Sequence, residues 1–224
     1  MIVQPNAFRF RSSGKVGKQF STPQVERKTY RLNCVKRMSC SHESKDRNGT
    51  GVEQWLPNAH ERELLRRTWS DEFKFLYELG SSIYIYIFEH NPHCKQLFPS
   101  IAKYGDDYKD SREFRIQALR FVQTISQVVK NIYHMDRLES YLYGIGQLHC
   151  KYAHRGFKPE YWDDFKDAME HSLTEHMNSL QDLDAQQRSE AVVVWRKVAR
   201  YIISHMRTGY FDGLKSINNH PPLT

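Results

Sequence analysis

The segment LESYLYGIGQLH, residues 138–149, carries the pattern on which the fold assignment of this 224-residue chain depends. Its apolar residues recur at steps of three and four, which is typical of one face of an α-helix, and they are Leu138, Leu142, Ile145 and Leu148. His149 extends this stripe, four residues after Ile145. A polar side chain on a buried face needs a partner, because an unsatisfied buried group costs about 1–3 kcal/mol. His149 therefore either bonds to backbone inside a core or binds a ligand.

A second helical segment, SREFRIQALRFV at residues 111–122, has the same anomaly. Gln117 lies inside an apolar stripe formed by Phe114, Ala118, Phe121, Val122, Ile125, Val129 and Ile132. Taken alone, Gln117 fits a core residue that bonds to backbone. Together with His149 it also fits a pair that faces across a ligand, and neutral imidazole is the usual protein ligand of haem iron. The spacing leaves both interpretations open.

Charge divides the chain into regions. Residues 1–50 hold 11 Lys/Arg and 3 Asp/Glu, whereas the remainder holds 33−11=22 basic and 26−3=23 acidic residues. A basic segment without an apolar period buries too little surface to offset its ordering entropy. We therefore expect a disordered basic tail over residues 1–55, a folded domain over 56–213 and a short tail over 214–224.

Composition argues against several classes of protein. No apolar run approaches the ~18 residues of a membrane span, and MIVQPNAFRF has no apolar signal core. The balanced charge of the folded region gives no sign of the basic face that nucleic acid would need, so no such partner is expected. Four scattered cysteines indicate a reducing, cytoplasmic location. Cys34 and Cys40 lie among basic residues, where an acyl chain would allow peripheral membrane contact; an uncommitted tail is the alternative.

Helical periodicity continues from Pro57 almost to the end of the chain. Asn91-Pro92 ends the second helix, because the residue before proline avoids the helical region. Residues 100–111 are polar and predict a loop. Further helices are expected over 114–132, 136–152, 159–180 and 185–209, and no strand alternation interrupts them. The pattern predicts an all-α domain.

Over about residues 56–213 the chain resembles the globin family, and within it neuroglobin and the nematode globins. The resemblance rests on ELLRRTW (63–69), LGSSIYIYIFEHNPHCKQLF (79–98), the two segments quoted above and AVVVWRKVARYIISHMRTGY (191–210). It implies a globin fold of about eight helices, packed three over three around haem b. It also places His149 at the proximal iron ligand, Phe98 at the haem-stacking phenylalanine and Gln117 at the distal position. Gly80 and Ala118 supply small residues for a close helix crossing.

A porphyrin needs a dry apolar slot. The expected lining, besides Phe98, consists of Phe121, Ile145, Leu148, Phe157, Trp162, Phe165 and Ile202. Tyr84 is the unusual residue on the distal side, where the family usually has Leu or Phe. We expect Tyr84 to point inward and Tyr86 to point outward. Tyr84 and Gln117 would then both donate hydrogen bonds to bound dioxygen and favour tight binding.

The resemblance implies a binding protein rather than an enzyme, with dioxygen or another diatomic gas as its ligand. The function expected first is oxygen binding, storage or transport. The alternative is a redox-active or gas-sensing globin that reacts with nitric oxide, nitrite or peroxide, since one haem site supports several functions. A homodimer is a possible assembly, and the sequence does not identify a reductant.

Overall fold

The computed structural model describes residues 54–219. The elements of this part, in chain order, are α1 (Ala59–Arg67), α2 (Phe73–His90), the 3₁₀ helix η1 (Pro92–Leu97), α3 (Pro99–Ala102), the 3₁₀ helix η2 (Gly105–Asp110), α4 (Arg112–Lys130), α5 (Met135–His149), the 3₁₀ helix η3 (Cys150–Arg155), α6 (Tyr161–Ser179) and α7 (Ala185–Asn219). All regular structure in residues 54–219 is helical, which confirms the expected all-α class.

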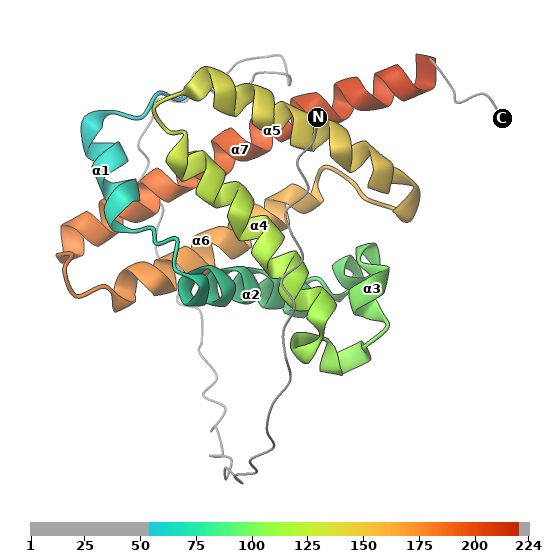
Figure 1. Ribbon diagram of the computed structural model, residues 1–224, viewed down its shortest axis with the longest axis horizontal. Coiled ribbons are helices and arrows are strands. Elements are labelled where there is room, and N and C mark those ends of the chain that lie inside the picture. Colours follow the sequence, from blue (N-terminus) through green and yellow to red (C-terminus); the bar gives the residue numbers. More distant parts are fainter. Residues whose placement is uncertain (1–53, 220–224) are drawn as a thin grey trace, which may run out of the picture. The chain divides into compact units, whose positions relative to one another are not determined.

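The helices form two layers. In one layer α6 lies between α2 and α7 and packs against both. In the other layer α4 crosses α2, and α5 and α1 pack on α7 (Figure 1). This arrangement confirms the expected three-over-three globin fold, with the apolar stripes of α2, α4, α5, α6 and α7 turned into one shared core.

Two helix starts follow from capping side chains. The Asn58 side chain accepts a hydrogen bond from the backbone N–H of Glu61 at 2.9 Å, and the Glu61 carboxylate accepts one from the N–H of Asn58 at 2.9 Å. This reciprocal pair begins α1. Glu61 is buried and also binds Lys197 of α7 at 2.7 Å, so the same carboxylate ties α1 to α7. Ser111 caps α4 by accepting from the N–H of Phe114.

The crossing of α2 and α4 depends on Gly80. A Cβ atom at this position would lie 2.5 Å from the carbonyl oxygen of Ala118 and 3.1 Å from Val122. Only a residue without a side chain permits the two backbones to approach this closely. The sequence-based expectation that Gly80 and Ala118 meet at a helix crossing is therefore confirmed.

A second close crossing joins α5 to α7. Gly146 of α5 faces the backbone carbonyl of Met206, and Gly209 of α7 faces the backbone carbonyl of Tyr143, each so closely that an added Cβ would collide with it. The two glycines thus act reciprocally, one on each helix. Because Gly146 lies one turn before His149, this crossing sets the position of the end of α5.

Three sequence-based expectations differ from the structure. Residues 100–111 are not a polar loop: Ile101 in α3 and Tyr108 in η2 are buried and hold these short helices on the core. The expected helix over 136–152 ends at His149 and continues as η3. The last helix does not end near residue 209 but runs to Asn219.

The predicted basic tail, including Cys34 and Cys40, lies outside the described residues. Within residues 54–219, no helix combines the length and the apolar character needed to cross a bilayer.

Candidate functional site

His149 occupies the C-terminal end of α5. Its Nδ1 lies 2.8 Å from the backbone carbonyl oxygen of Ile145. Because a carbonyl only accepts, Nδ1 carries the hydrogen and Nε2 carries the lone pair. Burial lowers the pKa of His149, so the ring is neutral near pH 7. A neutral imidazole whose Nδ1–H is held by backbone is the usual state of a metal-binding histidine.

Aromatic rings surround the His149 imidazole. The rings of Phe157 and Trp162 each lie 5.4 Å from it, centroid to centroid, and Tyr152 lies at 5.9 Å. Phe157 returns to the site through a turn at Gly156, whose φ of 85° favours glycine. Phe157 and Trp162, which the sequence predicts in the lining of a porphyrin slot, thus both lie against the His149 ring.

A second polar pair, Tyr84 and Gln117, lies where α2 and α4 cross. The Gln117 side-chain N–H donates to the Tyr84 hydroxyl oxygen at 2.8 Å. Tyr84 is only 2 % exposed, and burial raises the pKa of its hydroxyl, which therefore keeps its proton. The bond from Gln117 uses the oxygen of Tyr84 as acceptor, so the Tyr84 proton remains available to another acceptor.

Apolar rings enclose the Tyr84 side chain. Its centroid lies 5.4–5.9 Å from those of Phe88, Phe98, Phe121 and Phe165. Phe98, Phe121 and Phe165 were expected in the lining, whereas Phe88 was not singled out for the site. Its position one turn after Tyr84 on the same helix was the available signal.

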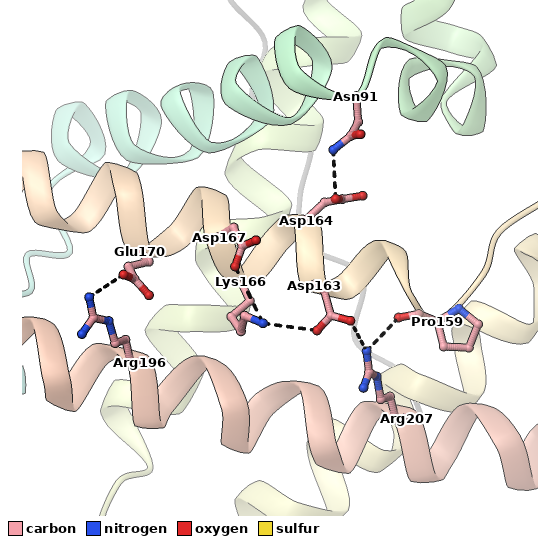
Figure 2. A network of polar contacts seen from close by, with 9 residues as sticks. All are labelled: Asn91, Pro159, Asp163, Asp164, Lys166, Asp167, Glu170, Arg196 and Arg207. Atoms are coloured by element: carbon pink, nitrogen blue, oxygen red, sulfur yellow. Dashed lines mark hydrogen bonds and ion pairs between the residues drawn. The ribbon is translucent and has the colours of Figure 1, made fainter. Parts of the chain in front are cut away.

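Helix α6 connects the two groups of rings. Trp162 contacts His149, and Phe165, one turn later, contacts Tyr84 and Phe121. The polar network drawn in Figure 2 holds this part of α6 in place. Its contacts are Arg207 to Asp163 at 2.7 Å, Lys166 to Asp163 at 3.4 Å, Arg196 to Glu170 at 2.5 Å and Asn91 to Asp164 at 2.9 Å.

The remaining predicted lining residues divide into two groups. Ile202 is buried in the core on α7, and Ile145 is half-buried and packs against the core. Leu148 is 55 % exposed, and the structure does not bring it into the ring cluster. The stripe on α5 predicted a buried Leu148, but a stripe at steps of three and four spans a wide arc, and Leu148 lies at its edge. Tyr152 and Gly146 also contribute to the site, although no sequence pattern selects either residue.

Comparisons with known proteins show which chains this one is similar to. The family model described as Globin matches residues 81–206. Globin-related protein glb-13 of Caenorhabditis elegans is 28% identical over 151 residues, which are 67% of this chain and 51% of that protein. Cytoglobin-2 of Oryzias latipes is 26% identical over 154 residues, 68% of this chain and 82% of that protein. The chain thus spans about half the length of the nematode relative and most of the fish one.

A solved structure has the same fold. It is the hexacoordinated heme protein of an anhydrobiotic tardigrade, with a TM-score of 0.58 and 21% sequence identity. The alignment covers 69% of this chain and 96% of the tardigrade chain.

Proposed function

This chain belongs to the globin family, and we propose that it is a haem protein that binds dioxygen reversibly. The observation that carries the proposal is the state of His149. Its Nδ1–H is held by the Ile145 carbonyl, and its Nε2 lone pair is free in an apolar ring cluster. That arrangement fits the single protein ligand of a haem b iron. The names of the relatives, cytoglobins and a heme protein among them, support the same cofactor.

Bound haem supplies an iron atom on which a diatomic gas binds. The chain's own residues then have separate roles. His149 would hold the iron, and Phe157 and Trp162, whose rings lie against its imidazole, would keep that ring in place and exclude water. Phe98, Phe121 and Phe165 form apolar walls around Tyr84, which is itself part of the core. A dry slot strengthens any hydrogen bond formed inside it.

Tyr84 and Gln117 are the proposed distal donors. Gln117 donates to the Tyr84 oxygen, so the Tyr84 O–H is polarised and can donate to a ligand that accepts hydrogen bonds. Gln117 acts partly through Tyr84, since one of its N–H groups is engaged there. Each hydrogen bond to a polar ligand is worth about 0.5–1.5 kcal/mol, and two would lower a dissociation constant by roughly ten- to a hundredfold.

Gln117 also determines the expected coordination of the iron. A neutral amide is a poor iron ligand, so we expect the ferrous protein to have five-coordinate iron before gas binds, unlike the tardigrade protein named as hexacoordinated. This expectation is testable with purified protein alone. An absorption spectrum of the ferrous, ligand-free protein distinguishes five- from six-coordinate iron.

The central experiment replaces His149. His149→Ala should lose haem during gel filtration, and added imidazole should restore the spectrum. The control is His205→Gln, which changes a second buried histidine, one whose ring packs on Tyr201. An unchanged haem spectrum in His149→Ala would contradict the assignment of the ligand.

Redox or sensing chemistry with nitric oxide, nitrite or peroxide is the second candidate. The observation that favours it is Tyr152, which is partly exposed and lies against the His149 ring. The haem site would then exchange electrons with a molecule at the surface. A cytoplasmic location, a homodimer and a lipid anchor at Cys34 and Cys40 stay predictions from the sequence.

A further inference from the structure

The segment that follows His149 forms a basic surface. Lys151, His154, Arg155 and Lys158 are all exposed. In the described part of the chain no carboxylate lies within 4.0 Å of the Lys151, Arg155 or Lys158 cations. Glu160 is the only acidic residue of the stretch from 150 to 160. These cations are therefore free to pair with another molecule.

The backbone of η3 explains why the cations point outward. Cys150 is buried, and its Sγ donates to the Tyr210 carbonyl at 3.2 Å, which holds the start of η3 on α7. The Gly156 turn then brings Phe157 back to the His149 ring. Lys151, Tyr152 and Arg155, between these two anchors, lie on the outer side.

Tyr152 connects this surface to the proposed iron ligand. Its side chain is 41 % exposed, its ring centroid is 5.9 Å from that of His149, and the Arg155 guanidinium lies 5.2 Å from its ring. One aromatic ring thus touches solvent, a surface cation and the imidazole at the same time. A molecule that docks on the cations would be separated from His149 by a single side chain.

We propose that the η3 surface, defined as Lys151, Tyr152, His154, Arg155 and Lys158, docks an acidic protein that carries a one-electron redox centre. The inference rests on the proposed function, because it assumes haem at His149. One electron leaves the partner's centre, which is oxidised, and reduces the haem iron from ferric to ferrous; no bond forms or breaks and no proton moves. Opposite charges steer such encounters and raise association rates by about 10–1,000-fold at low salt.

The ring contact favours a redox protein over a lipid membrane as the occupant. Anionic lipid would use the cations equally well but would not use a tyrosine placed against His149. Near this surface the large exposed hydrophobic side chains of residues 148–160 are Leu148 and Tyr152, which is less apolar area than a helix that enters a bilayer interface presents.

The first test measures binding, with a plant-type [2Fe–2S] ferredoxin as an acidic low-potential probe. Lys151→Glu/Lys158→Glu is compared with Arg120→Glu/Arg200→Glu, which changes the net charge equally at two exposed arginines elsewhere on the chain. Binding is measured by calorimetry, with this protein and the ferredoxin both oxidised. At low ionic strength Lys151→Glu/Lys158→Glu should bind ferredoxin roughly tenfold more weakly than Arg120→Glu/Arg200→Glu, and this difference should shrink as salt is added. Equal loss in both variants, or no loss, overturns the proposal.

The second test measures electron transfer from reduced ferredoxin to the ferric protein by stopped flow. Tyr152→Ala should slow the transfer several-fold, whereas Tyr141→Ala, which removes a side chain that is also 41 % exposed and lies on α5, should not. Equal rates in the two variants overturn the role of Tyr152. Binding to vesicles of phosphatidylserine and phosphatidylcholine, without binding to ferredoxin, overturns the choice of partner. A chain that binds ferredoxin but no haem would refute the proposed function and not the docking surface.

Discussion

Replacing Gly146 with alanine tests how the proximal helix is positioned. The added Cβ would collide with the Met206 carbonyl of α7. A backbone carbonyl inside a helix cannot move aside without moving the helix, so α5 and α7 must separate. Overpacking of this kind costs about 1–3 kcal/mol, and more where the contact is backbone.

Gly144→Ala is the matched control. This glycine lies on the same helix two residues earlier, and no atom lies within 4 Å of the Cβ that alanine would add. Both substitutions gain about 1 kcal/mol of helix propensity. Their difference therefore isolates the cost of the crossing, and we expect Gly146→Ala to be less stable than Gly144→Ala by about 1–3 kcal/mol.

Urea unfolding followed by circular dichroism gives both free energies, provided that the slope with denaturant stays constant. Gly146→Ala should also retain haem less well, because His149 lies one turn beyond the substituted residue. Equal unfolding midpoints for the two variants would refute the argument that Gly146 is required by the crossing.

Three further results are expected. Tyr84→Phe should speed dioxygen dissociation by roughly tenfold, about 1.4 kcal/mol, and affect carbon monoxide much less, with Tyr86→Phe as the control in flash photolysis. A chain that starts at Gly51 should keep the haem spectrum, and loss of haem would show that the tail contributes to the domain. Burial lowers the pKa values of His149, His176 and His205 below 6.5. The unfolded chain therefore binds more protons, and the stability of the haem-free protein should fall as pH drops below about 6.5; an acid titration without such a loss would contradict their burial.

The sequence predicted well those features that depend on periodicity or on a family motif. The stripes of α4 and α5 predicted the helices that carry Gln117 and His149, and the resemblance predicted that Tyr84 turns inward. Spacing alone did not decide whether His149 binds a ligand or backbone. In the structure the two interpretations are compatible, because His149 bonds to backbone through Nδ1 and its Nε2 can still bind a ligand.

Features that depend on a partner helix could not be predicted in the same way. The role of Gly146 follows from where Met206 lies, and no local pattern contains that information. Ile101 and Tyr108 are single apolar residues in a polar stretch, too few to produce a period, and their burial appears only once the core is assembled. Leu148 is exposed because it lies at the edge of the apolar stripe of α5, and spacing alone does not show where the buried part of such a stripe ends.

The contact between Gly80 and the Ala118 carbonyl has a mechanical consequence for the distal pair. Gln117 directly precedes Ala118, and Tyr84 lies one turn after Gly80, so the hydrogen bond between them is close to the point where the two helices touch. A rigid helix that rotates about one contact point moves least at the residues next to that point. If α4 tilts on α2, its ends travel several times further than Gln117 does. Such a tilt would therefore move the ends of α4 while the hydrogen bond between Gln117 and Tyr84 stays in register.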